Sequence, residues 1–284
     1  MYEAFYGFHE KPFHVTADPG FLYPSRDHRE ALSHLLYGIR QRLGFIMITG
    51  EVGTGKTSLA KALVAQMGGA TRTALILNPG LWGNHLLRTI LNDFNGRPCS
   101  DQAGQGEWIN SIEQLLLKQA ENGGTAVLIL DEAQTMNTDT LEQIRLLSNV
   151  ETAKMKLLQI ILLGQPELTQ RLREEPRLRP LQERIAVRYQ IQPLDEKEVA
   201  AYITHRLRAA GAKWLSLFSP EAVARITRES GGIPRRINWI CDHALLAGFV
   251  QDSKWIDERL VEEALRVGTS DRAEESEKEL IKQS

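Results

Sequence analysis

Five short apolar runs alternate with helical patterns over the first two thirds of the chain. The three middle runs consist almost entirely of Ile, Leu, Val and Ala, as is typical of parallel strands buried on both faces. Between the runs, apolar residues recur at helical spacing, which predicts amphipathic helices. The expected strands are Phe45–Thr49, Thr73–Leu77, Ala126–Leu130, Gln159–Leu163 and Val187–Ile191, and the expected helices span 26–42, 56–67, 82–94, 107–121 and 140–149. This alternation predicts a doubly wound α/β sheet with its ligand at the carboxyl ends of the strands.

The pattern changes after Pro193-Leu194, beyond which only helices are expected. Asp195 precedes Glu198 as in a capping box, and Ser219-Pro220 is a typical helix start. The expected helices here are 195–210, 220–230, 235–248 and 257–267. We therefore predict an N-terminal segment and helix over 1–44, an α/β core over 45–194, a helical domain over 195–268 and a flexible tail over 269–284.

A glycine-rich loop follows the first expected strand and opens the next helix. It matches the pattern G-x-x-x-x-G-K-T in the strand–loop–helix context that a phosphate-binding loop, or P-loop, requires. Its glycines let backbone N–H groups approach phosphate oxygens, its lysine places a charge on the β- and γ-phosphates, and its threonine hydroxyl binds Mg²⁺. The predicted nucleotide-binding residues are Gly50, Glu51, Val52, Gly53, Thr54, Gly55, Lys56, Thr57 and Ser58.

Two acids end the apolar run Val127–Leu130. A buried strand ending in Asp131-Glu132 brings both carboxylates to the edge of the sheet where the P-loop lies. We expect Asp131, with Thr57, to hold Mg²⁺, and Glu132 to orient and deprotonate the attacking water. The combination predicts an ATPase with ATP and Mg²⁺ as its ligands.

Three weaker signals each have two interpretations. Asn78 ends an expected strand and either holds Glu132 back from the water or is a turn residue before Pro79. Gln165 either contacts the γ-phosphate or its water, or starts a helix before Pro166. The six arginines between positions 171 and 188 either include a catalytic side chain or form a solvated helix face.

The first forty residues are rich in aromatic side chains, Pro and His. Turn chemistry at Asp18-Pro19-Gly20 precedes Tyr23. This segment either packs on an edge of the core or also covers the nucleotide base, in which case Tyr23 is a binding residue.

The overall composition limits the kinds of partner and the cellular location that we expect. Lys and Arg number 34 against 36 Asp and Glu in 284 residues, a formal net charge of −2. A near-neutral chain has no general attraction to nucleic acid, so DNA is not expected as a partner, although a local basic rim would escape this count. Cys99 and Cys241 lack metal-ligand spacing and are expected to be reduced thiols. No apolar run approaches the roughly 20 residues of a membrane span and no secretory signal is evident, which predicts a cytoplasmic protein.

The motifs together resemble the AAA+ family of oligomeric P-loop ATPases. The resemblance rests on the P-loop, Asp131-Glu132, Gln165 after a strand, Glu183-Arg184-Ile185 and Gly232-Ile233-Pro234-Arg235. It implies a small helical lid after the core and a homo-oligomer that depends on nucleotide. It also implies that Arg184 reaches the neighbouring subunit's nucleotide and that Arg235 contacts the γ-phosphate. Rival assignments remain for both roles, namely Arg179, Arg188 and Arg236.

A finer resemblance is to bacterial secretion ATPases of the ExeA/GspA type. It is carried by Phe5-Tyr6-Gly7-Phe8, Asp18–Tyr23, His28–Leu32 and Gly164–Leu168. MSHA-pilus biogenesis ATPases share much of this pattern, and TniB-like transposition ATPases share it more distantly. The resemblance implies a partner in a secretion or pilus machine, reached at the inner membrane through that partner or through a region missing from this chain. A DNA-associated AAA+ regulator of the transposition type is the main alternative, and a signalling NTPase with negligible turnover is a third.

Overall fold

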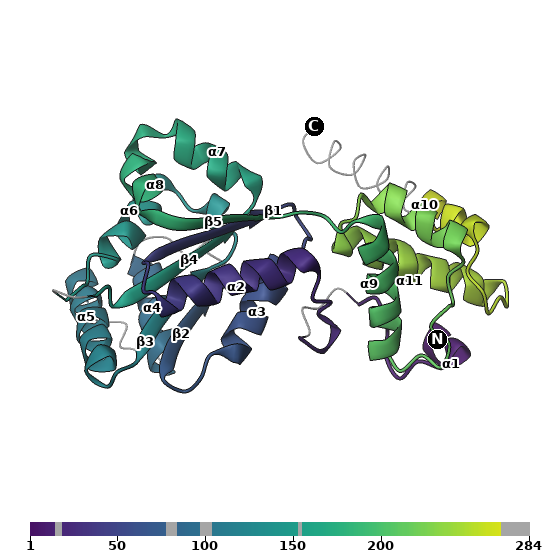
Figure 1. The fold of residues 1–284 in the computed structure, drawn as a ribbon, viewed down its shortest axis with the longest axis horizontal. Helices are drawn as coiled ribbons and strands as arrows, with labels where there is room; N and C mark the ends of the chain where they lie inside the picture. Colours follow the sequence, from purple (N-terminus) through teal and green to yellow (C-terminus); the bar gives the residue numbers. More distant parts are fainter. Residues whose placement is uncertain (15–18, 78–83, 97–103, 153–154, 268–284) are drawn as a thin grey trace. The chain divides into compact units, whose positions relative to one another are not determined.

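The computed structural model describes residues 1–14, 19–77, 84–96, 104–152 and 155–267. The chain forms two compact units, one built from Arg26–Gln192 and the other from Met1–Ser25 together with the residues from Pro193 onward. We call them the α/β unit and the helical unit (Figure 1). The chain passes between the units twice, after Ser25 and after Gln192.

The α/β unit is built on a parallel sheet. Within the described residues the sheet has five strands, in the order β2-β3-β4-β1-β5. The three interior strands are almost entirely buried, whereas the two edge strands alternate buried and half-buried or exposed residues. The bounds are β1 Phe45–Gly50, β2 Thr71–Ile76, β3 Thr125–Leu130, β4 Leu158–Gly164 and β5 Ile185–Ile191. All five predicted strands are confirmed.

Helices cover both faces of this sheet (Figure 1). On one face α2 and α3 bury Leu35, Leu59 and Leu63 against strand residues such as Ile48. The remaining helices of the unit share a second core on the other face, which contains Ile112, among other residues. The bounds are α2 Arg26–Arg40, α3 Lys56–Gln66, α4 Asn84–Asn95, α5 Gln105–Glu121, α6 Thr138–Leu147, α7 Pro166–Glu174 and α8 Arg179–Arg184. The predicted doubly wound α/β architecture is confirmed.

The helical unit follows the predicted capping signals. Asp195 accepts a hydrogen bond from the Glu198 amide at 2.8 Å, and Ser219 caps the next helix through the Ala222 amide at 3.1 Å. Such caps satisfy backbone donors that have no partner inside the helix. The helices are α9 Glu196–Ala209, α10 Pro220–Ser230 and α11 Pro234–Val250, and residues 258–267 are also helical. No helix in the described part of the chain is long and apolar enough to cross a membrane.

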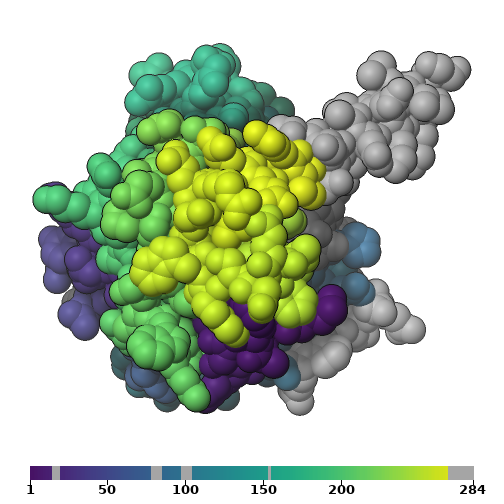
Figure 2. Space-filling view, turned by 90° about the vertical axis from the view of Figure 1, so that its right-hand side faces the viewer, coloured from purple at the N-terminus to yellow at the C-terminus, as the bar shows by residue number. Residues whose placement is uncertain are grey.

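The N-terminal segment packs within the helical unit. Tyr2, Tyr6 and Phe8 are buried in the same cluster as the helices of this unit, and α1 (Tyr2–Tyr6) contacts α11. Arg206 of α9 donates to the Pro12 carbonyl at 2.6 Å. Figure 2 shows the purple N-terminal residues beside the yellow C-terminal ones on one face. Residues 1–25 therefore pack against residues about 200 positions away in the sequence. The sequence had instead led us to group residues 1–44 as one segment that leads into the core.

Candidate nucleotide site

The P-loop connects the end of β1 to the start of α3, and its geometry requires its glycines. Gly53 and Gly55 have φ angles of 83° and 97°, a region that residues with a Cβ adopt at a cost. At Gly50 a Cβ atom would lie 2.9 Å from Thr54 Oγ1 and 3.1 Å from the Ile191 carbonyl oxygen. The loop is closed by Thr54, whose hydroxyl donates to the Glu51 carbonyl at 2.8 Å. The backbone therefore folds tightly at the amino end of α3, where the helix dipole and free N–H groups favour an anion.

Lys56 is held inside this loop. Its side chain is only 5% exposed, and Nζ donates to the carbonyls of Gly50 at 2.8 Å and Glu51 at 3.0 Å. Burial lowers the pKa of Lys56, and the negative charges of Glu132 and Asp131 oppose that shift. A buried ammonium beside the amino end of a helix is suited to bind a phosphate, because both attract its negative charge.

Thr57 and Asp131 meet where β3 ends beside the start of α3. The Thr57 hydroxyl donates to Asp131 Oδ2, and Asp131 is 2% exposed. Burial raises the pKa of this carboxyl, while hydrogen bonds from Thr57 and the Glu132 amide act to lower it. The described residues contain no cluster of three or more His, Cys, Asp or Glu side chains that could hold a metal alone. One carboxylate and one hydroxyl fit Mg²⁺, which binds few protein oxygens and completes its shell with water and phosphate.

Glu132 is positioned by two glutamines. Its Oε2 accepts hydrogen bonds from Gln134 Nε2 at 2.6 Å and Gln165 Nε2 at 3.2 Å. The backbone N–H of Gln165 in turn donates to Gln134 Oε1 at 3.1 Å. Glu132 has a φ of 52°, an unfavourable value for a residue with a side chain and one that is common at functional sites. The structure therefore brings the predicted Gln165 to the predicted Glu132.

Gln134 and Arg171 also belong to this arrangement, and neither was predicted from the sequence. Gln134 lies two positions after Glu132, a spacing that gave no signal of contact. Arg171 of α7 donates from Nη1 to the carbonyls of Gln134 at 2.7 Å and Met136 at 2.8 Å, and so supports the turn that carries Gln134. Asn78, predicted to hold Glu132, lies outside the described residues.

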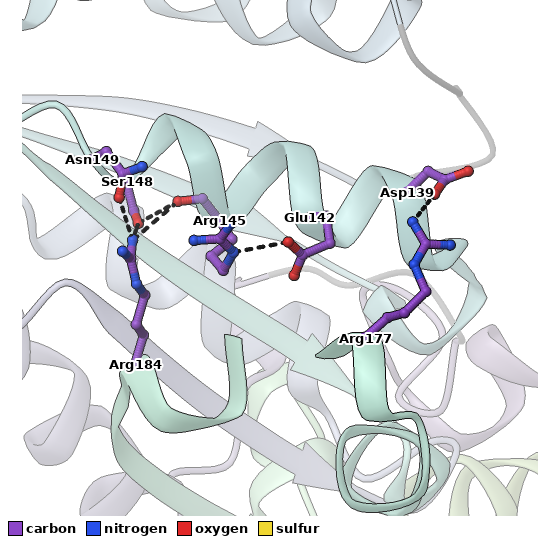
Figure 3. A network of polar contacts seen from close by, with 7 residues as sticks. All are labelled: Asp139, Glu142, Arg145, Ser148, Asn149, Arg177 and Arg184. Carbon is purple, nitrogen blue, oxygen red and sulfur yellow. Dashed lines mark hydrogen bonds and ion pairs between the residues drawn. The ribbon is translucent and has the colours of Figure 1, made fainter. Parts of the chain in front are cut away.

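Arg184 ends α8 and binds the end of α6 (Figure 3). Its Nη1 donates to Ser148 Oγ at 3.0 Å, to the Arg145 carbonyl at 3.4 Å and to Asn149 Oδ1. A cation at a helix carboxyl end is stabilised by the unpaired carbonyls and the helix dipole. The rival Arg179 is exposed and pairs with Glu183, while the rival Arg188 donates to the Gln182 carbonyl at 2.6 Å.

Tyr23 and Arg235 belong to the helical unit. Arg235 is exposed in the first turn of α11, next to exposed Arg236. The ring of Tyr23 packs edge-on against Tyr202 and His205 of α9, with centroid distances of 5.9 and 5.7 Å. Packing of Tyr23 on α9 is therefore observed, and its contact with a base remains a prediction.

We expect Tyr23→Ala to weaken binding of ATP and ADP by the same factor. A residue that covers only the base contacts both nucleotides equally and leaves γ-phosphate chemistry unchanged. Titration of the two nucleotides, followed by fluorescence or calorimetry, measures this. Unchanged affinities combined with a lower melting temperature would restrict Tyr23 to packing on α9.

The fold and the loop geometry are those of a P-loop NTPase core. Residues 39–172 match the sequence family described as "AAA domain". The fold resembles the Aeropyrum pernix ORC2 protein, with a TM-score of 0.67, 18% identity, and coverage of 90% of this chain and 71% of that one. It also resembles the Thermotoga maritima RuvB Holliday junction branch migration motor, with a TM-score of 0.55, 16% identity and coverage of 87% and 73%. At these identities the likeness shows the fold alone.

The predicted resemblance to the GspA type is confirmed by a curated relative. The chain is 45% identical over 253 residues to General secretion pathway protein A of Aeromonas hydrophila. The match covers 89% of this chain and 46% of that protein, so the chain spans about half of the relative's length. An AAA domain within this match implies that the chain binds a nucleotide.

Proposed function

We propose that this chain binds ATP with Mg²⁺ and hydrolyses it to ADP and phosphate. The observation that carries the proposal is the convergence of three loops on one sheet edge. The P-loop brings Lys56 and Thr57, the end of β3 brings Asp131 and Glu132, and the end of β4 brings Gln165. Phosphate binding, metal binding and water activation need these residue types in such proximity.

Each side chain has a role in the proposed reaction. Lys56 binds the β- and γ-phosphates, and Thr57 and Asp131 hold Mg²⁺, which neutralises phosphate charge when bound. Glu132 accepts a proton from the attacking water. At the same time the oxygen of that water bonds to the γ-phosphorus, and the bond between the γ-phosphorus and the departing ADP breaks. Gln134 and Gln165 keep the Glu132 carboxylate oriented for that transfer.

Hydrolysis is proposed to occur in a homo-oligomer. Arg184 of one subunit would approach the γ-phosphate bound to its neighbour, and Arg235 would contact the γ-phosphate from the lid. A guanidinium that meets the phosphate only in the assembled state makes turnover depend on assembly. In this structure Arg184 donates hydrogen bonds to Ser148 and Asn149. Its side chain must break these hydrogen bonds before it can reach the nucleotide of a neighbouring subunit.

The proposed biological role is assembly of an envelope secretion or pilus machine. It is supported by 45% identity to General secretion pathway protein A, over about half of that protein's length. A DNA-associated regulator is the second candidate, because the fold also resembles that of Drosophila ORC, whose structure was solved bound to DNA. That likeness, at 21% identity, concerns the fold.

Two linked measurements separate these roles. Double-stranded DNA should leave the rate of phosphate release unchanged, because a chain with 34 basic and 36 acidic residues attracts DNA weakly. Replacing the gene with its Lys56→Ala version in the organism that encodes it should block secretion or pilus assembly. Stimulation by DNA of several-fold, with secretion and pili intact, would support the DNA-associated role instead.

A further inference from the structure

The first turn of α2 contacts the P-loop. His28 is 6% exposed, and its Nε2 lies 3.0 Å from the Thr54 carbonyl oxygen. Because a carbonyl only accepts, Nε2 carries the hydrogen in this contact. The same nitrogen lies 2.8 Å from the position that a Cβ atom of Gly55 would occupy. His28 therefore fixes the peptide between the loop's closing threonine and its last glycine.

The same turn also contacts the end of β5. Asp27, adjacent to His28, accepts a hydrogen bond from the Gln192 amide at 2.8 Å. The P-loop itself contacts β5, since Gly50 is paired with Ile191 and has no room for a Cβ beside it. The P-loop, the first turn of α2 and the end of β5 thus touch one another pairwise. Residue 192 is the last of the α/β unit before the chain enters the helical unit.

We infer that His28 is a positioning residue for phosphate binding and, with Asp27, ties the P-loop to the chain connection at Gln192. Phosphate oxygens bound by the loop's N–H groups fix the Thr54–Gly55 peptide. His28 and Asp27 then transmit that order to the backbone that leads into the helical unit. This inference rests on the proposed nucleotide binding, and it adds a residue outside the loop, strand and lid motifs.

Substitutions at His28 test directly whether the hydrogen bond from its Nε2–H to the Thr54 carbonyl supports nucleotide binding. His28→Leu removes the N–H and leaves a buried carbonyl without its donor, so affinity for ATP and ADP should fall about tenfold. His28→Gln places an amide N–H at a similar reach and should restore most of that loss, whereas the shorter side chain of His28→Asn should not. His34→Leu is the matched control, because His34 lies on α2 but its ring faces Tyr189, with centroids 5.2 Å apart.

Hydrogen exchange tests the coupling. Bound ATP should slow exchange in the peptide covering residues 185–194 in the wild type and in His34→Leu, and not in His28→Leu. Equal ATP affinity of His28→Leu, His28→Gln and the wild type would overturn the inference. If His28→Leu does not fold, the comparison of Gln with Asn decides: the Gln variant should bind ATP more tightly than the Asn variant, whereas a purely structural role would change only their melting temperatures. Absence of ATP binding by the wild type and His34→Leu would instead contradict the proposed function.

Discussion

Mixing Arg184→Ala with Lys56→Ala should restore ATP hydrolysis that neither variant shows alone. Arg184→Ala retains the P-loop, Asp131 and Glu132 but lacks the arginine that it would offer to its neighbour. Lys56→Ala cannot bind ATP tightly and still carries Arg184. At an interface between the two, the nucleotide lies in the first subunit and the arginine comes from the second. An arginine supplied in this way contributes on the order of 10³–10⁵ in rate.

The structural role of Arg184 requires its own control. Arg184 binds the end of α6, so its removal also takes a cation from that helix end. Asn149→Ala removes one partner and leaves the guanidinium, and it should keep wild-type turnover. Arg179→Ala removes an exposed, surface-paired arginine and should have little effect. Failure of the mixture, in conditions where the wild type assembles, would exclude Arg184 as the residue acting between subunits and leave Arg179 and Arg188 to be tested.

Glu132→Gln should keep ATP binding and lose turnover by a factor of about 10²–10⁴. An amide cannot take the proton of the attacking water. The other contacts proposed for the nucleotide and its Mg²⁺, through Lys56, Thr57 and Asp131, should be unchanged by the substitution. Equilibrium binding of ATP and single-turnover phosphate release measure the two effects separately.

A matched exchange of acid for amide serves as the control. Asp139→Asn alters an exposed carboxylate whose partner is Arg177 (Figure 3), and such surface pairs contribute little. It should leave both binding and turnover as in the wild type. Gln134→Ala keeps the Glu132 carboxylate but removes its shortest hydrogen bond, so turnover should fall by less than in Glu132→Gln. Equal loss of ATP binding in Glu132→Gln and Lys56→Ala would contradict the separate roles of these residues.

Local patterns were sufficient to predict the sheet and most of the helices. The buried runs at β1, β3 and β4 are typical of a parallel sheet with both faces covered. The P-loop could be located because glycine spacing, lysine and threonine act within eight consecutive residues. Helix starts such as Asp195 and Ser219 were predictable because caps are short-range interactions.

Contacts between distant residues were not predictable in this way. Arg171 reaches the turn that carries Gln134 only because α7 packs against that turn, and no pattern in the chain marks the pairing. The aromatic residues before Ser25 were expected to pack on an edge of the core or also to cover the base, and the sequence did not show that they share a core with residues beyond Pro193. Likewise, the position of Arg184 in the sequence does not show that α6 ends beside it.

We propose that the residues that converge at this sheet edge hydrolyse ATP with Mg²⁺. Release of phosphate from ATP by the assembled protein tests it most directly, with Lys56→Ala and a metal chelator as the two controls. We expect repeated turnover with Mg²⁺, and we expect the chelator or the Lys56→Ala substitution to abolish it. Turnover that persists undiminished in Lys56→Ala, or its complete absence in assembled wild-type protein that binds ATP, would contradict the claim.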